Sequence, residues 1–166
     1  MDVEAFGDTE CVFNSKENLN VDLLDGLDEY VKILDKHNIK GTFFTVGELA
    51  PKIKDRLHKI IKNGHRLALH NFKHIPPLDI NIDEFRTQIY NAKESLSNMF
   101  NTKIEGFRAP CFSMDNQRMD VLRELGFKYD SSNLGFSKAR HTRNINFDNF
   151  SHLGDGIFTA DDFFEF

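Results

Sequence analysis

The sequence predicts an α/β fold in which helices alternate with the short strands of a parallel sheet. Apolar residues at three- and four-residue spacings indicate helices, and short aromatic or β-branched runs between them indicate strands. The chain has 166 residues, of which 40% are hydrophobic, and this is enough for one core. Because parallel strands need right-handed crossovers, we expect an open sheet or a barrel, in one domain over residues 1–166.

The first half of the chain contains two helices, each followed by a strand. Over residues 21–36 apolar side chains recur at helical spacing, and the aromatic run 42–46 that follows fits a buried strand. A second apolar stripe over 53–61 stops at an Asn-Gly pair, which commonly ends a helix. Residues 66–69 are expected to form the next strand.

The second half continues the alternation. Residues 83–100 form the longest expected helix, with an asparagine or aspartate cap at its start. The run 104–108 is strand-like, 116–125 is helical, and 127–129 is a further short strand-like run. The polar segment 131–149 is expected to be a loop.

Charge and hydropathy exclude two classes of partner. The chain has 21 Lys and Arg against 26 Asp and Glu, a net charge of -5, so it lacks the basic surplus that nucleic-acid binding requires. No apolar run reaches the ~20 residues that span a bilayer, and the N-terminus lacks the regions of a signal peptide. We therefore expect no nucleic-acid partner, no transmembrane segment and a cytoplasmic location. The oligomeric state is not readable from the sequence.

The two cysteines, Cys11 and Cys111, are too few for a disulfide framework and have no CxxC spacing. The sequence does not exclude a disulfide bond between them. Two small buried thiols are the simpler interpretation, and we expect both to be free.

His70 and His74 directly follow the expected strand 66–69, at a strand end where α/β folds commonly bind ligands. If residues 71–74 form one helical turn, both imidazoles project from the same side and can share a metal. Zinc favours imidazole ligands, usually with a carboxylate and an open position at a catalytic site. An HxxxH pair by itself is more often two solvated histidines on a loop.

Asp2 and Glu4 supply the carboxylates that such a site requires. Alternate residues of an extended strand point to the same face, so one carboxylate could bind the metal and the other act as a base. Asp8 and Glu10 continue the acidic run, and position alone does not select the pair.

Two further polar residues end expected strands. Arg108 follows an apolar run and precedes Ala109 and Pro110, and an arginine there can orient a carboxylate through two hydrogen bonds. Asp130 ends the next short strand-like run and is another candidate to face the site.

These segments together resemble the NodB-like polysaccharide deacetylases. The resemblance rests on DVEAF, KGTFFTVGELA, NGHRLALHNFKH, GFRAPCFSM and LGFKYDSS, which stand in the family's order and spacing. The variant with Asp-x-Glu in place of Asp-Asp looks most similar. The resemblance implies a distorted (β/α) barrel, incomplete here because the chain is short at both ends and lacks the C-terminal part.

The resemblance also implies roles for the residues that match these motifs. Asp2 would be the general base and Arg108 would orient it, while a divalent metal, zinc for preference, would be held by three ligands. Those ligands would be Glu4, His70 and His74. The substrate groove and its surroundings would include Pro110 and Asp130.

The function expected from the resemblance is removal of acetyl groups from the N-acetylated sugars of a polysaccharide. The family's general acid, a histidine late in the chain, has no clear counterpart, since only His141 and His152 follow residue 132 and neither has the expected context. The alternatives are a catalytically incompetent domain that binds a metal or a carbohydrate, and a hydrolase of small cyclic amides.

Overall fold

The computed structural model describes residues 1–4, 24, 26–134 and 145–166. Along the chain its helices and strands are β1 (Asp2–Val3), α1 (Leu27–Lys36), β2 (Thr42–Thr45), η2 (Ala50–Ile53), α2 (Lys54–Lys62), β3 (Arg66–Leu69), η3 (Pro77–Asp79), α3 (Ile82–Phe100), β4 (Gly106–Phe107), η4 (Pro110–Phe112), α4 (Asn116–Glu124), β5 (Tyr129–Asp130), β6 (Ser151–Gly154), β7 (Ile157–Ala160) and β8 (Phe163–Glu165).

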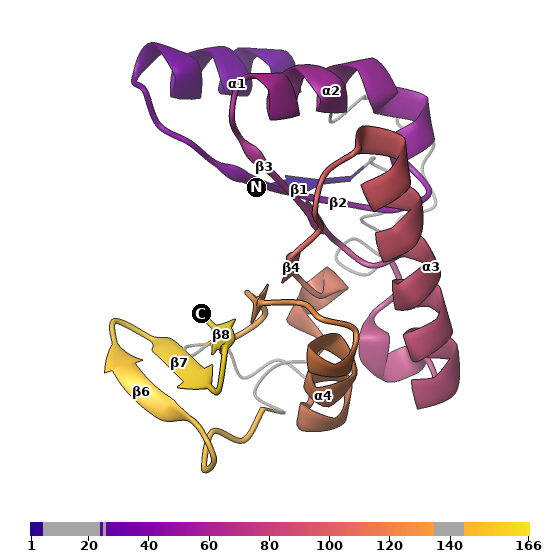
Figure 1. Ribbon diagram of the computed structural model, residues 1–166, viewed down its shortest axis with the longest axis vertical. Coiled ribbons are helices and arrows are strands. Elements are labelled where there is room, and N and C mark those ends of the chain that lie inside the picture. Colours follow the sequence, from indigo (N-terminus) through magenta and orange to yellow (C-terminus); the bar gives the residue numbers. More distant parts are fainter. Residues whose placement is uncertain (5–23, 25, 135–144) are drawn as a thin grey trace.

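The strands of the described residues form one mixed sheet in the order β1-β2-β3-β4-β5-β8-β7-β6. The pairs from β1 to β5, and the pair β5 with β8, are parallel, whereas β6, β7 and β8 form an antiparallel meander. The sheet is open, with β1 and β6 at its edges, and α1 to α3 pack beside its first strands (Figure 1). The expected α/β fold with a parallel sheet is confirmed.

The helices bury the apolar stripes that predicted them. In α3 the buried side chains include Phe85, Ile89 and Leu96. The side chain of Asn81 caps this helix by accepting a hydrogen bond of 2.9 Å from the backbone nitrogen of Glu84. The helix therefore begins at the asparagine cap rather than at an aspartate.

The expected strands agree with the structure in order but not always in length. The run 104–108 contains only the two-residue strand β4, and β5 begins two residues later than the expected run 127–129. The expected helix 21–36 begins at Leu27, and residues 21–23 and 25 lie outside the described part. The expected loop 131–149 also lies partly outside it, since residues 135–144 are not described.

The expectation of two free thiols is wrong for Cys111, which is disulfide-bonded. Cys11, the one other cysteine of the sequence, lies outside the described residues. Two cysteines a hundred residues apart carry no local signal of pairing, because the sequence does not fix the distance between their Cα atoms.

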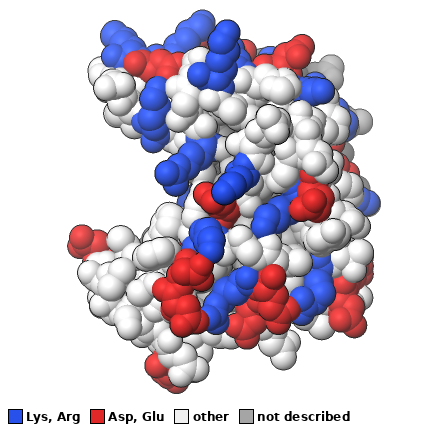
Figure 2. All heavy atoms as spheres, in the orientation of Figure 1, with Lys and Arg blue, Asp and Glu red and all other residues white. Residues whose placement is uncertain are grey.

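None of the helices in the described part of the chain is long and apolar enough to cross a membrane. On the face shown in Figure 2, basic and acidic side chains lie intermingled, and the surface is hollowed between the part that carries α1 and the part that carries β6 and β7.

Candidate metal centre

β1 brings Asp2 and Glu4 to the carboxyl end of the sheet. Its pairing with β2 is held by hydrogen bonds from the backbone nitrogen of Phe44 to the oxygen of Met1 (2.9 Å) and from Val46 to Val3 (3.3 Å). Val3 is fully buried, whereas the residues on either side of it are half-buried. Because neighbours in a strand alternate, Asp2 and Glu4 share the opposite face, as predicted.

The loop after β3 carries both histidines. The backbone nitrogen of His70 donates to the oxygen of Thr45 on β2 (2.9 Å), which fixes the start of this loop. Asn71 then has a positive φ of 60°, so residues 71–74 do not form the helical turn that we expected. A helical turn requires negative φ at each residue.

The side chain of Asn71 replaces the missing helical hydrogen bonds. It is fully buried, its Oδ1 accepts from the backbone nitrogen of Phe72 (2.8 Å), and its Nδ2 donates to the oxygen of Ile75 (3.0 Å). Asparagine tolerates the left-handed conformation better than most residues, which explains its place here. The closed loop turns His74 back toward His70, while Lys73 is exposed on the outside.

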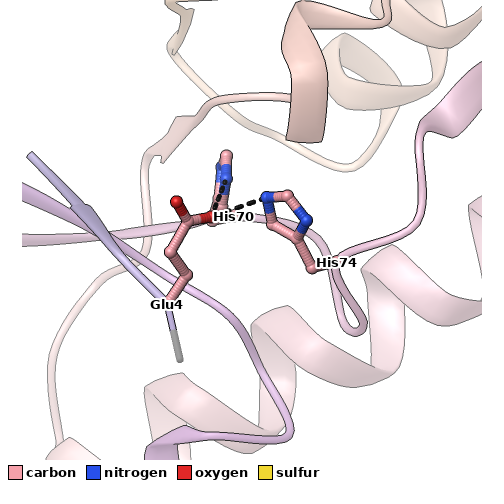
Figure 3. Close-up of side chains that lie close together, drawn as sticks. All are labelled: Glu4, His70 and His74. Carbon is pink, nitrogen blue, oxygen red and sulfur yellow. Dashed lines mark ion pairs between the residues drawn. The ribbon is translucent and has the colours of Figure 1, made fainter. Parts of the chain in front are cut away.

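Glu4, His70 and His74 converge on one point (Figure 3). Oε2 of Glu4 lies 2.6 Å from Nε2 of His74 and 3.6 Å from Nε2 of His70. The three potential ligand atoms all lie within 4.8 Å of one another. Among the described residues, this is the group of His, Cys, Asp and Glu side chains whose geometry suits a metal ion.

The tautomer of His70 is set by the backbone. Its Nδ1 lies 2.7 Å from the carbonyl oxygen of Arg108. A carbonyl only accepts, so Nδ1 carries the hydrogen and the neutral ring presents the lone pair of Nε2 toward Glu4. This is the arrangement in which a histidine binds a metal through one nitrogen and is oriented through the other.

The carboxylate of Glu4 is held ionised. Burial raises its pKa, but the interactions with His70 and His74 outweigh this and lower the pKa to about 2. Although both imidazole nitrogens are near, the buried Oε2 receives no hydrogen bond of good geometry. The two rings and the carboxylate thus face a common point, and an ionised oxygen left without a donor there suits a cation.

Two imidazoles and one carboxylate are a donor set that zinc accepts at catalytic sites. Ligand atoms about 2.0–2.2 Å from a tetrahedral ion lie roughly 3.3–3.6 Å apart. The 3.6 Å between Glu4 and His70 agrees with this spacing, whereas the 2.6 Å between Glu4 and His74 would have to widen around an ion. The residues present therefore fit a divalent metal.

Arg108 connects this centre to Asp2. Its Nη1 donates to Oδ1 of Asp2 (2.9 Å), while Nε and Nη2 donate to the backbone oxygen (2.9 Å) and hydroxyl (2.7 Å) of Ser131. The guanidinium also lies 4.3 Å from the ring centroid of Phe44. Each of the three guanidinium nitrogens thus donates a hydrogen bond, and Asp2 is held in one orientation beside Glu4.

The family model described as polysaccharide deacetylase matches residues 22–129 of this chain. The chain belongs to the polysaccharide deacetylase family. The match excludes Asp2 and Glu4, which the fold nevertheless brings to the two histidines of the matched part.

Three similar proteins illustrate the extent of this relationship. A peptidoglycan-N-acetylglucosamine deacetylase of Bacillus cereus is 39% identical over 71 residues, which are 41% of this chain and 26% of that protein. A solved structure assigned to the polysaccharide deacetylases, from Mycobacterium smegmatis, superimposes with a TM-score of 0.66 at 27% identity, over 86% of this chain and 45% of that one. A pseudoenzyme of the same family from Bacillus anthracis has a TM-score of 0.58 at 22% identity, over 61% and 36%.

The chain therefore spans about a quarter of its curated relative and less than half of the M. smegmatis structure. The superposition confirms the expected deacetylase-type fold. The open sheet agrees with the expectation that the distorted barrel is incomplete.

The remaining predicted residues of this deacetylase-family chain lie next to the centre. Pro110 is buried and begins η4, two residues after Arg108. Asp130 is fully buried at the end of β5. A direct substrate contact of either residue stays a prediction, and the buried carboxyl of Asp130 acts on its surroundings through its neighbours.

Three residues that support the centre were not identified from the sequence. They are Ser131, Ser132 and Glu165. The resemblance included the two serines only as letters of a motif, and Glu165 lies in an apolar run, where a single carboxylate flanked by phenylalanines was the available signal.

The described residues do not place a histidine at the centre beyond His70 and His74. His152 lies on β6, where it is exposed and stacks on Phe158 at a centroid distance of 4.8 Å. His141 lies outside the described residues.

Proposed function

We propose that this family member is a metal-dependent hydrolase that removes acetyl groups from the N-acetylated sugars of a polysaccharide. The observation that carries the proposal is the convergence of Glu4, His70 and His74 next to the Arg108–Asp2 pair. The B. cereus relative is named for N-acetylglucosamine in peptidoglycan, so polymers of that sugar are the first substrates to test.

The chemistry assigned to each group follows from its position. When bound, a divalent metal acts as a Lewis acid on the acetyl carbonyl and lowers the pKa of the attacking water. Glu4, His70 and His74 would hold the ion, and zinc is the metal we propose. Asp2 is partly exposed, with 27% of its side-chain surface accessible, so it can reach that water and take its proton while Arg108 fixes its carboxylate.

A second candidate function is a domain that binds a metal or a carbohydrate without turnover. It is favoured by the positions of the described histidines, since the candidate metal group contains only His70 and His74 and His152 lies exposed on β6. Loss of activity does occur within this fold, as the B. anthracis pseudoenzyme illustrates.

The test measures zinc content and acetate release on the same preparations. We expect about one zinc per chain and acetate release from N-acetylglucosamine oligomers, and we expect His70→Ala to lose both. His37→Ala, at the exposed end of α1, is the matched control and should retain both. Zinc uptake without acetate release would favour the binding domain. Absence of zinc from the wild type would contradict both the zinc-dependent hydrolase and the metal-binding form of the second candidate.

A further inference from the structure

Asp130 and Glu165 form a buried carboxyl pair beside the proposed base. They lie opposite each other on the parallel strands β5 and β8, and neither side chain is exposed. Oδ2 of Asp130 and Oε2 of Glu165 are buried and receive no hydrogen bond from the described residues. Two carboxylates can only accept, so a proton on one of the two groups is what would join these oxygens. Burial raises the pKa of both groups, and the charge of Asp130 raises that of Glu165 further.

The remaining oxygens of the pair hold the segment after β5. Oε1 of Glu165 accepts hydrogen bonds from the backbone nitrogens of Ser132 (3.1 Å) and Asn133 (2.8 Å). Oδ1 of Asp130 accepts from the hydroxyl of Ser132 (2.6 Å). That hydroxyl in turn accepts from the backbone nitrogen of Ala109 (2.8 Å). The pair thus ties the segment to the residue that follows Arg108.

The same segment supplies the partners of Arg108. Ser131 lies between Asp130 and Ser132, and its backbone nitrogen donates to the oxygen of Phe107 (3.0 Å). Its oxygen and hydroxyl accept two of the three side-chain hydrogen bonds of Arg108, and the third goes to Asp2. A displacement of Ser131 would therefore be transmitted to Asp2 through one guanidinium.

We propose that Glu165 is a positioning residue of the centre: through the proton it shares with Asp130 it fixes Ser131 and Ser132, and through them the arginine that orients Asp2. This role deepens the proposed deacetylase function and rests on it. In this role Glu165 and Asp130, both fully buried, act on Asp2 through these hydrogen bonds.

The charges around the pair give the proposal a measurable consequence. Arg108 is the cation whose charge acts on Asp130, and Phe158, opposite Glu165 on β7, carries none. In the described part of the chain, the pair also contacts the neutral Ser131, Ser132 and Asn133, and the uncharged Phe107 lies opposite Asp130 on β4. When the shared proton is lost, two buried negative charges face one guanidinium, and they compete with Asp2 for it.

The experiment follows the ¹⁵Nε chemical shift of Arg108 in zinc-loaded protein from about pH 5 to about pH 9, with the signal assigned by Arg108→Lys. In the wild type the shift should change as the pair loses its proton. In Glu165→Gln, which keeps the shape and the acceptor oxygen but stays neutral, the shift should remain constant. Glu124→Gln, which removes an exposed carboxylate of α4, is the control and should titrate like the wild type. A wild-type shift as constant as that of Glu165→Gln, or the same titration in both, would overturn the proposal.

A second variant, Glu165→Ala, removes the carboxyl and leaves two backbone donors unpaired. We expect kcat for acetate release to fall about tenfold or more, while KM and zinc affinity stay within about threefold of the wild type. An unchanged kcat would contradict the positioning role. If this variant does not fold, the titration of Glu165→Gln still tests the positioning role of Glu165.

The two proposals fail separately. The chemical shift requires no substrate, so it tests the carboxyl pair even if the wild type releases no acetate. Acetate release by the wild type together with an unaltered titration in Glu165→Gln would remove the positioning role and leave the deacetylase function standing.

Discussion

Arg108 and Asp2 are joined by a charged hydrogen bond of 2.9 Å although they lie 106 residues apart in the sequence. β1 and β4 are not neighbours in the sheet, since β2 and β3 lie between them. The long side chain of Arg108 crosses this distance over the ring of Phe44, on β2. The carboxylate proposed as the base is thus oriented from a different part of the sheet than its own strand.

Arg108→Lys tests this orientation. Lysine keeps the charge but cannot bind Asp2 and Ser131 at once, because it lacks the planar fork of the guanidinium. We expect kcat for acetate release to fall about 10- to 100-fold with little change in zinc affinity. Arg123→Lys, on the surface of α4, is the control and should have no effect. Equal losses of zinc affinity and kcat would show that Arg108 supports the metal ligands rather than Asp2.

Asn71 should determine the shape of the loop that carries the histidines. Asn71→Ala loses two side-chain hydrogen bonds and puts at a positive φ a residue that tolerates this conformation less well than asparagine, so we expect it to lower the free energy of unfolding by about 2–4 kcal/mol. Asn71→Gly loses the same hydrogen bonds without the backbone strain and should be less destabilised. Urea unfolding measures both, and equal losses would exclude a contribution of the backbone conformation.

Both Asn71 variants should also bind zinc more weakly. The loop that they loosen sets the position of His74 relative to His70. We expect a loss of about 10- to 100-fold, as for other residues that orient metal ligands. Unchanged zinc affinity in a destabilised variant would mean that the metal itself closes the loop.

Gly106 should not tolerate a side chain. It lies opposite Tyr129 in the pairing of β4 with β5, and a β-carbon there would overlap with the tyrosine ring. We expect Gly106→Ala to lower the free energy of unfolding by about 2–3 kcal/mol. Adding Tyr129→Leu removes the clash, so the double variant should lose less than the sum of the single losses. Additive losses in thermal or urea unfolding would show that the tyrosine moves aside at no cost.

The Asp130–Glu165 pair makes stability depend on pH. Because the folded protein holds a carboxyl proton that the unfolded chain releases near pH 4, the stabilisation is complete below about pH 4 and is lost as pH rises through the raised pKa. The slope should approach about 1.4 kcal/mol per pH unit for one proton. The lowered pKa of Glu4 acts in the opposite sense and at more acidic pH, so it does not obscure this range.

Metal-free wild type and Glu165→Gln, unfolded in urea across this range, provide the measurement. The histidines contribute equally to both proteins, so the difference between their slopes reports the pair. A wild-type stability that rises with pH relative to Glu165→Gln would contradict the shared proton.

Much of the fold follows from local pattern. The apolar residues whose spacing predicted the helices are the residues that α2, α3 and α4 bury, because a helix has the same period wherever it packs. The strand lengths were less accurate, since β4 and β5 have only two residues each and their pairing depends on neighbours distant in the sequence. The meander of β6 to β8 was not predicted for the same reason.

The sequence by itself determined the order of the helices and strands, the polar residues at the strand ends and, by resemblance, the candidate ligands Glu4, His70 and His74. Only the tertiary structure decided how they meet. The loop of His74 is closed by a buried asparagine at a positive φ rather than by a helical turn, and the carbonyl of Arg108 fixes the tautomer of His70. Arg108 donates to Ser131, in the segment that Asp130 of β5 and Glu165 of β8 hold through hydrogen bonds to Ser132 and Asn133. These are contacts between segments far apart in the chain, and because no local period encodes them, they exist only once the sheet sets the register.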